Sequence, residues 1–195
     1  MGRREITKAA NRAAILAAGR DVFAERGYGA ASVRDIVRRT PLASGTFYNY
    51  FPDKEGVFRA LVEQTGEEAR RRVRAARRRA RTPEDFVRGP YRAFFEFIVE
   101  DPHRHAFIRR NLGTLRAHFG DAVLPAGTDE LAEDLSAAIA AGHLPPVDVD
   151  YCAHAMIAVA LELAERLVQR TPPDVDGATD FASALFLGAL AVSKR

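Results

Sequence analysis

Ser44–Phe51 read SGTFYNYF, and this stretch decides the fold because it places four aromatic rings and an amide within eight residues. Burial of the whole segment would remove two tyrosine hydroxyls and an asparagine amide from water, which is unfavourable. An ordinary surface loop rarely contains so many aromatic rings. As a short helix, the stretch has an apolar side formed by Phe47 and Phe51, which lie one turn apart. The opposite, polar side carries Ser44, Gly45, Tyr48 and Asn49.

The residues that precede this stretch predict two helices and a tight turn. Helical apolar spacing runs from about residue 7 to residue 26 and stops at Gly27. Ser32, with Asp35 three residues later, is a capping box that opens the next helix. Residues 40–43 then form a turn before the aromatic stretch, and so we expect a helix-turn-helix unit.

The polar side of the aromatic stretch suits DNA. Hydroxyl and amide groups hydrogen-bond base edges, a tyrosine ring packs on a thymine methyl group, and Gly45 lets the backbone approach closely. Thr46 and Tyr50 flank this side, where they can bond phosphates, and Lys54 adds a positive charge at the start of the following helix. The alternative interpretation is a small aromatic core with a solvated rim.

The distribution of charge favours an anionic partner for the first part of the chain. The net charge is +3, but residues 1–65 carry 11 Lys/Arg against 7 Asp/Glu, whereas residues 82–195 carry 10 against 17. Residues 70–81 hold eight arginines and no acid. We interpret this run either as a solvated helix flank whose side-chain stems cover apolar surface or as a site for an anionic ligand.

The whole sequence predicts an all-α protein of about nine helices. Glycines, prolines and capping residues punctuate a helical apolar spacing, and nothing alternates as a strand does. Thr82 and Thr128 mark later helix starts. We assign residues 1–53 to a helix-turn-helix DNA-binding domain and residues 54–195 to a ligand-binding and dimerisation domain.

The second domain holds candidates for the lining of an apolar ligand cavity. In the alternative interpretation these residues are ordinary bundle core, and both can hold because such a cavity is a hole in the core. The candidate ligand-binding residues are Phe94, Phe95, Ile98, Phe107, Leu112, Phe119, Met156 and Leu163.

Two late segments, residues 151–164 and 181–192, are apolar nearly all round. A helix with no polar face must be covered on both sides, which a second copy of the chain provides in a two-fold four-helix bundle. The alternative is an internal hairpin in a monomer. The candidate dimer-interface residues are Ala160, Ala164, Leu167, Phe181, Ala184, Leu185 and Gly188.

Other classes of function have no signal in the sequence. The one cysteine, Cys152, allows no intrachain disulfide, and we expect a cytoplasmic protein without a membrane span. The five histidines lack the spacing of metal ligands, and so we expect no metal site. There is no phosphate-binding loop, nucleophile elbow or carboxylate pair, and we therefore expect neither an enzyme nor a cofactor.

A strong resemblance to the DNA-binding domain of the TetR (tetracycline repressor) family is carried by residues 15–62. The motifs are GY after the first helix, SVRDI in the second, GTFYNYF in the third and KE at the start of the fourth. The resemblance implies an all-helical homodimer that represses promoters and leaves its DNA operator when a small molecule binds the C-terminal domain. An activator, or an architectural DNA-binding protein without a ligand, is the alternative.

The same resemblance implies roles for individual residues. It places Ser32, Thr46, Tyr50 and Lys54 at phosphates. It places Arg34, Ser44, Gly45, Tyr48 and Asn49 in or near the major groove. Residues 97–113, FIVEDPHRHAFIRRNLG, also resemble the subgroup that senses fatty acids or fatty acyl-CoA, which implies an apolar, acyl-type effector.

The turn departs from the family pattern, which commonly reads Ala-Gly-Val-Ser where this chain has Thr-Pro-Leu-Ala at residues 40–43. Pro41 cannot take a positive φ, and Ala43 has no side chain that can cap a helix. We expect one of two repairs: Ser44 caps one residue late, or Thr40 caps with Pro41 at the first helical position.

Overall fold

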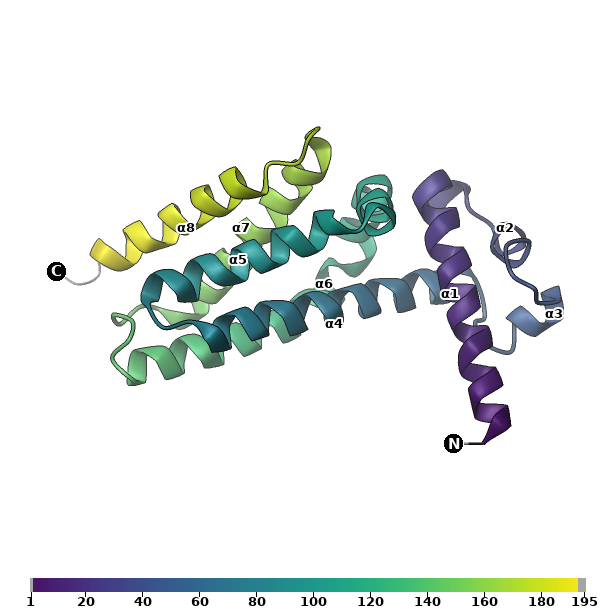
Figure 1. The fold of residues 1–195 in the computed structure, drawn as a ribbon, viewed down its shortest axis with the longest axis horizontal. Helices are drawn as coiled ribbons and strands as arrows, with labels where there is room; N and C mark the ends of the chain where they lie inside the picture. Colours follow the sequence, from purple (N-terminus) through teal and green to yellow (C-terminus); the bar gives the residue numbers. More distant parts are fainter. Residues whose placement is uncertain (1, 193–195) are drawn as a thin grey trace. The chain divides into compact units, whose positions relative to one another are not determined.

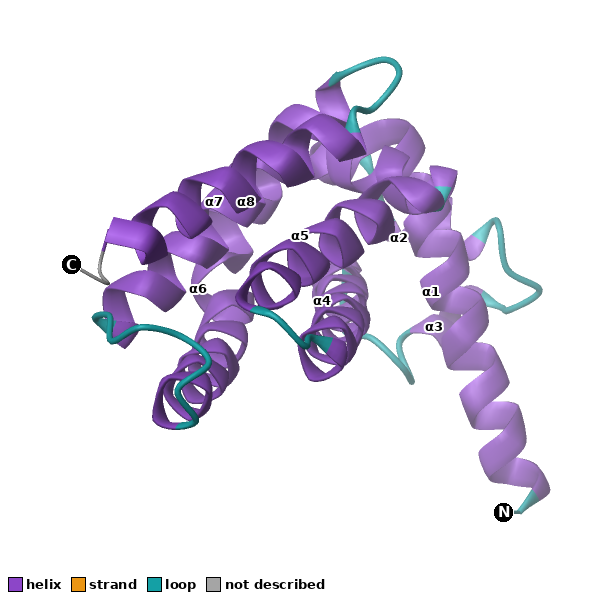
Figure 2. Cartoon of the chain, turned by 60° about the vertical axis from the view of Figure 1, so that its left-hand side comes forward, coloured by secondary structure: helices purple, strands orange, loops and turns teal. Residues whose placement is uncertain are grey.

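The computed structural model describes the backbone of residues 2–192 and the side chains in that range except those of residues 116, 118–126 and 190–192. The described backbone consists of helices and loops (Figures 1 and 2), which confirms the predicted all-α class. Two of the helices, α1 and α6, are interrupted by a residue with non-helical torsions, Gly27 and Asn111 respectively. The helices are α1 (Arg3–Ala30), α2 (Val33–Val37), α3 (Ser44–Phe47), α4 (Lys54–Arg79), α5 (Pro83–Glu100), α6 (Pro102–Ala140), α7 (Val149–Gln169) and α8 (Val175–Val192).

The chain divides into two compact units. The first comprises the chain up to Thr65 together with Pro102–Phe119, and the second comprises Gly66–Asp101 and the chain from Gly120 onward. The domain boundary predicted between residues 53 and 54 does not coincide with the division into packing units, and the assignment of separate functions to its two sides stays a prediction.

Two glycines of α1 shape the first unit. Gly27 has a φ of 76°, in the left-handed region that favours glycine, and it ends the regular part of α1 as predicted. A Cβ atom at Gly19 would lie 2.6 Å from Cγ1 of Val57, so this glycine lets α1 and α4 pack closely.

The capping box predicted for α2 is confirmed. The Ser32 hydroxyl accepts a hydrogen bond from the Asp35 N–H at 3.2 Å and donates to the Asp35 carboxylate at 2.6 Å, which in turn accepts from the Ser32 N–H at 3.1 Å. The bond from the Ser32 hydroxyl is the main reason that the pKa of Asp35 is lowered from its ordinary value. Farther along, Arg39 donates two hydrogen bonds, of 2.7 and 2.5 Å, to Glu25 and so joins the end of α2 to α1.

Neither repair predicted for the turn is correct. The N-cap of α3 is Ala43, which makes no side-chain capping bond, so the cap is neither Ser44 nor Thr40. Thr40 instead holds the turn itself, because its hydroxyl donates to the Val37 carbonyl at 2.9 Å and accepts from the Leu42 N–H at 3.3 Å.

The third helix is shorter than predicted. It is regular only over Ser44–Phe47, and the predicted remainder up to Phe51 is a hydrogen-bonded turn in which the N–H groups of Tyr50 and Phe51 both bond the Phe47 carbonyl, at 2.9 and 3.1 Å. Pro52 follows directly and has no N–H to continue a helix. The i, i+4 relation of Phe47 and Phe51 survives this change, and both rings are buried.

The start of α6 belongs to the first unit. Phe107 packs against Phe23 and Phe58, with ring centroids 6.4 and 5.3 Å away. Asn111, at the break in α6, is 2% exposed; its amide oxygen accepts from the Tyr28 N–H at 2.7 Å, and its amide nitrogen donates to the carbonyls of Phe23 and Phe107 at 3.0 and 2.7 Å. These bonds satisfy backbone groups where α1 ends.

The second unit packs α5 against α7 and α8, with the later parts of α4 and α6 beside them (Figure 1). Thr82 caps α5 with Pro83 at its first position, as predicted. α6 continues through Thr128, where the sequence predicted a new helix. Within the described residues, none of the helices combines the length and the apolar character that crossing a bilayer requires.

Candidate DNA-reading surface, effector cavity and exposed apolar face

The turn after α2 and the start of α3 present a polar surface over a buried ring. Phe47 is 0% exposed, whereas Tyr48 is 59% exposed and lies edge-on to Phe47 with ring centroids 5.4 Å apart. The buried Phe47 ring anchors the backbone of α3, and the exposed Tyr48 ring is accessible to a binding partner. Beside Tyr48, the structure leaves Ser44, Gly45 and Asn49 exposed. We call Ser44, Gly45, Tyr48 and Asn49 the reading surface.

The other residues predicted to contact DNA differ in exposure. Tyr50 is half-buried and its hydroxyl accepts a hydrogen bond of 3.1 Å from the Asn11 side chain of α1. Thr46 is also half-buried, and Ser32 is exposed but engaged in its capping box. Arg34 is exposed on α2 and forms no ion pair with the side chains that the structure describes. Their contacts with DNA stay predictions.

Lys54 begins α4 as predicted, and its side chain is bonded within its own chain. Its ammonium donates to the carbonyls of Tyr28 and Ala31 at 2.8 and 2.9 Å, with a longer contact of 3.4 Å to the Gly29 carbonyl. It also lies 4.6 Å from the centroid of the Tyr28 ring, within the range of a cation–π interaction. An ammonium has three donors, and here they serve the carbonyls around the end of α1. The structure therefore gives Lys54 a structural role, because its donors are already bonded to backbone carbonyls and a phosphate would have to compete with them.

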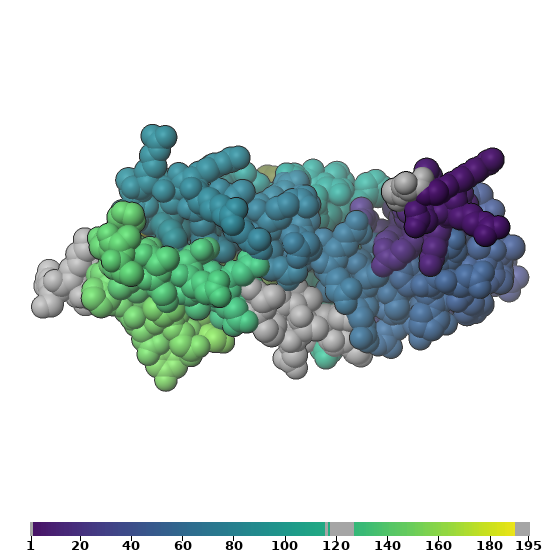
Figure 3. All heavy atoms as spheres, turned by 90° about the horizontal axis from the view of Figure 1, so that it is seen from below, coloured from purple at the N-terminus to yellow at the C-terminus, as the bar shows by residue number. Residues whose placement is uncertain are grey.

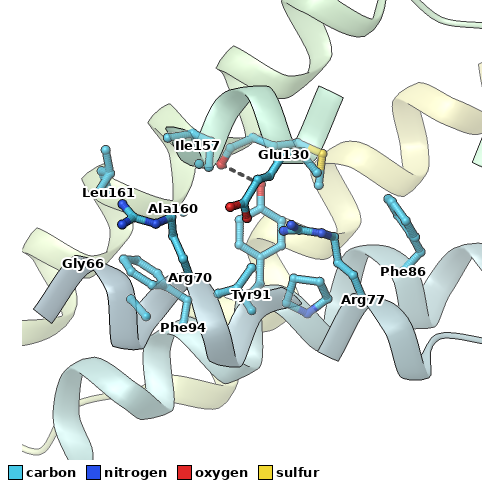
Figure 4. Close-up of a pocket in the computed structure, with 16 residues that line it drawn as sticks. Gly66, Arg70, Arg77, Phe86, Tyr91, Phe94, Glu130, Ile157, Ala160 and Leu161 are labelled. Atoms are coloured by element: carbon cyan, nitrogen blue, oxygen red, sulfur yellow. Dashed lines mark hydrogen bonds between the residues drawn. The ribbon is translucent and has the colours of Figure 1, made fainter. Parts of the chain in front are cut away.

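The second unit holds a partly open cavity of about 150 Å³ between α4, α5, α6 and α7 (Figure 4). Most of its wall is apolar. The lining residues are Gly66, Ala69, Arg70, Val73, Arg77, Phe86, Pro90, Tyr91, Phe94, Gly127, Glu130, Leu131, Met156, Ile157, Ala160 and Leu161.

The polar groups of the cavity wall already have partners. The Tyr91 hydroxyl donates to the Met156 carbonyl at 3.1 Å, and burial raises the pKa of this hydroxyl so that it stays neutral. The two arginines and the glutamate of the wall are all in ion pairs. The pairs are Arg70 with Glu67 at 2.7 Å, Arg77 with Asp134 at 2.6 Å, and Glu130 with Arg74 at 3.2 Å. Such a wall favours an uncharged, apolar guest.

The arginine run of α4 is for the most part paired within the chain. Arg71 pairs with Glu68, and Arg72 bonds both Glu68 at 3.0 Å and Glu100 at 2.5 Å. Arg72 also lies 5.0 Å from the centroid of the Phe97 ring. These contacts support the first of the two interpretations of the run, in which arginine stems cover apolar surface.

An exposed apolar face lies on α7 and α8. Tyr151 is 75% exposed and Leu161 41% exposed on α7, and Phe181 is 62% and Leu185 50% exposed on α8. Phe181, Leu185 and the intervening Ala184 fall on one stripe of α8, with Gly188 one turn on. So many large apolar side chains in contact with water mark a surface that another molecule covers.

Comparison with known proteins finds a family match in the helix-turn-helix region. Residues 15–61 match the family model described as bacterial regulatory proteins, tetR family. The chain carries a TetR-type DNA-binding domain. The resemblance predicted from the sequence is thus confirmed.

Solved structures of similar fold extend over nearly the whole chain. A TetR-family transcriptional regulator from Pectobacterium atrosepticum shares 26% identity at a TM-score of 0.69, covering 97% of this chain and 96% of that one. The regulator FadR from Bacillus subtilis, solved in complex with stearoyl-CoA, shares 20% identity at a TM-score of 0.75, covering 88% and 95%. RolR, in complex with resorcinol, shares 21% identity at a TM-score of 0.64, covering 95% and 90%.

Beyond the TetR-type domain, the structure brings together only part of each predicted set. Of the ligand-binding candidates, Phe94 and Met156 line the cavity. Phe95 and Ile98 are buried in the second unit without lining it, and Leu163 is half-buried on α7 and does not line it either. Phe107 and Leu112 belong to the first unit, and the side chain of Phe119 lies outside the described residues.

The predicted dimer residues divide in the same way. Phe181, Ala184, Leu185 and Gly188 are exposed on α8 as predicted. Ala164 and Leu167 are only 6% and 2% exposed, because they lie on the side of α7 that faces the core of their own chain. Ala160 lines the cavity. The interface candidates predicted from the sequence did not include Tyr151 and Leu161. Both are apolar residues in a segment with few polar residues, and this signal could have identified them.

No metal site accompanies the TetR-type domain in the part of the chain whose side chains are described, where no group of three or more His, Cys, Asp or Glu residues could hold an ion. Cys152 is half-buried, and burial raises the pKa of its thiol, which therefore stays protonated at neutral pH.

Proposed function

We propose that this protein is a transcriptional repressor that binds a near-palindromic DNA operator as a homodimer and leaves it when a small apolar effector enters the cavity. The observation that carries the proposal is the reading surface, which stands exposed on a buried ring within a TetR-type domain. In this proposal, residues 1–53 bind DNA, residues 54–195 bind the effector and the second copy, and the protein works in the cytoplasm without a cofactor.

The exposed face of α7 and α8 supports the homodimer. Two such faces brought together would bury Tyr151, Phe181 and Leu185 in a four-helix bundle, with Ala184 and Gly188 allowing close approach. A dimer is also what the DNA requires, because two recognition helices can then enter successive major grooves of one operator.

The cavity supports the binding of an effector, and its volume limits the size of the molecules that fit. A cavity of about 150 Å³ with apolar walls is the size that holds one benzene-sized molecule, below the range usual for ligand pockets. A single aromatic ring or a short apolar chain fits this conformation. A long acyl chain, such as that of the stearoyl-CoA bound to the FadR structure, exceeds this volume, so it would have to extend through the open side of the cavity or widen it.

The effector can release DNA only by binding one conformation more tightly than another. We therefore expect the ligand-bound chain to hold its two reading surfaces at a spacing that no longer matches the operator. A protein that keeps its DNA in the presence of every compound would instead be an architectural DNA-binding protein, and one that raises transcription from the bound site would be an activator.

Footprinting on the DNA upstream of its own gene tests the proposal. We expect one protected, near-palindromic segment, whose protection is lost on addition of a single-ring aromatic compound such as resorcinol and is little changed by stearoyl-CoA at equal concentration. Absence of any protected segment would refute the DNA-binding proposal. Release by stearoyl-CoA alone would refute the size argument and leave the repressor proposal standing.

A cavity-filling variant links the release to this cavity. Ala69 lines it and is 9% exposed, so Ala69→Leu places three additional carbon atoms in a space of about 150 Å³. We expect A69L to bind operator as the wild type does and to need much more effector for release. Ala137→Leu, the same substitution at an exposed position of α6, is the matched control. Equal effector sensitivity of A69L and A137L would place the effector elsewhere.

A further inference from the structure

The first turns of α1 carry positive charges that no described side chain neutralises. Arg3, Arg4 and Lys8 are all exposed, and they form no ion pair within the described part of the chain. The one nearby acid, Glu5, is turned back and accepts a hydrogen bond of 3.0 Å from the Gly2 N–H in a capping box. This contrasts with the arginines of α4, most of which have acidic partners.

These charges face a groove shared with the turn after α3. One wall consists of side chains of α1, and the other of Asn49 and Tyr50, which follow the reading surface in sequence. We call this the N-terminal groove. Its lining residues are Arg3, Arg4, Thr7, Lys8, Asn49 and Tyr50. In Figure 3 the N-terminal side chains, in dark purple, project freely from the surface of the first unit.

Two contacts hold the walls of the groove together. The Asn11 side chain donates a hydrogen bond of 3.1 Å to the Tyr50 hydroxyl, and the Arg12 guanidinium lies 5.3 Å from the centroid of the Phe51 ring. Both contacts join α1 to the turn that follows α3, within the first unit. A molecule seated on Tyr48 and Asn49 therefore continues into a cationic groove, because Asn49 also lines it.

We propose that the N-terminal groove holds the sugar–phosphate backbone of the DNA strand that borders the reading surface, with Arg3, Arg4 and Lys8 bound to successive phosphates. This inference rests on the proposed DNA-binding function and adds to it a second contact surface outside the helix-turn-helix. Arg4 and Lys8 are four residues apart, about 6 Å along the axis of α1, and Arg3 adjoins Arg4, so the start of α1 presents three cations to the groove.

Phosphates suit these cations better than base edges do. Arginine and lysine on long stems reach phosphate oxygens and form charge-assisted hydrogen bonds with them, and the groove offers one amide, that of Asn49, for reading a base. The contribution of the groove is therefore electrostatic and independent of DNA sequence. It appears as a dependence of affinity on salt, because each phosphate neutralised releases counterions.

The test compares two triple variants that remove the same charge. Arg3→Gln/Arg4→Gln/Lys8→Gln removes the three cations of the groove, and glutamine keeps the helix propensity of these exposed positions. Arg78→Gln/Arg79→Gln/Arg81→Gln removes three exposed arginines of the second unit and is the control. For each, the affinity for operator and for an unrelated duplex is measured over a series of salt concentrations.

We expect the groove variant to reduce the slope of log affinity against log salt by about 0.9 for each phosphate that is no longer neutralised, or about 2.7 for each copy bound, on both DNA molecules. The control variant should keep the wild-type slope. An unchanged slope for the groove variant, or equal changes in the two variants, would overturn the inference. If the wild type binds neither duplex, the DNA-binding proposal itself fails, which is a separate outcome.

Discussion

Replacement of Lys54 by methionine distinguishes a phosphate contact from a structural one. The substitution keeps an unbranched apolar side chain but removes the ammonium that bonds the carbonyls of Tyr28 and Ala31. The structure predicts that K54M lowers the free energy of unfolding of the first unit and leaves the salt dependence of DNA binding as it was. The sequence resemblance predicts the opposite pair of results.

The magnitude follows from the contacts. A hydrogen bond from a charged donor contributes about 1.5–3 kcal/mol, and Lys54 is half-exposed, which places it at the lower end because water can replace the missing donor. The contact with the Tyr28 ring adds about 0.5–1 kcal/mol at a site of this exposure. These contributions are not additive in full, and we expect the free energy of unfolding to fall by about 2 kcal/mol in total.

Urea denaturation, followed by the circular dichroism of the helices, measures this decrease. Arg59→Met is the matched control, because Arg59 lies on the same helix and, among the described side chains, forms only an exposed ion pair with Glu55, worth under about 1 kcal/mol. Operator affinity is then measured against salt for the folded K54M protein. An unfolding free energy equal to that of the wild type, combined with a flatter salt slope, would show that Lys54 contacts phosphate and would refute the structural reasoning.

Three further predictions follow from exposure and from the pKa shifts. Tyr48→Ala should weaken operator binding at least tenfold in fluorescence anisotropy, without lowering thermal stability, since Tyr48 is 59% exposed; a decrease in stability would show that the ring is core. Because the pKa of Asp35 is lowered mainly by Ser32, its contribution to stability is present above the ordinary pKa of aspartate and is lost as the pH falls below it. Ser32→Ala should therefore destabilise the protein more at pH 7 than at about pH 2, because at low pH only the capping bond from the Asp35 N–H remains to be lost, as urea midpoints at the two pH values will show. Phe181→Glu should give a monomer in light scattering and reduce operator affinity, and a dimer that persists would exclude α8 from the interface.

Local signals in the sequence predicted where the regular part of α1 ends and where α2 begins. Gly27 and the capping box of Ser32 act within a few residues of themselves, so their effects can be read without knowing the fold. The turn before α3 was mispredicted for the same reason. Both predicted repairs assumed that the helix needs a side-chain cap, whereas the Thr40 hydroxyl bonds the Val37 carbonyl and Ala43 begins the helix uncapped.

The sequence predicted an apolar cavity in the second domain, but it did not predict which residues line the cavity. Phe94 and Phe107 both lie in aromatic-rich helical sequence, and periodicity treats them alike. Phe94 lines the cavity, whereas Phe107 packs on Phe58 in the first unit. The two residues differ in which distant helix packs against them, and such long-range contacts cannot be read from local sequence. Lys54 is a similar case, since its carbonyl partners lie 23 to 26 residues earlier.

The two arginine-rich regions show why charge in a sequence does not by itself identify a binding surface. The run on α4 is the denser, yet Arg72, Arg74 and Arg77 meet acids brought by α5 and α6, and an arginine that already holds a carboxylate must give it up before it binds another anion. Arg3 and Arg4 have no such competitor among the described side chains, so a phosphate there gains the full interaction at little cost. The position of the acids therefore decides where an anion binds, and it directs DNA to the start of α1 and away from the arginine run.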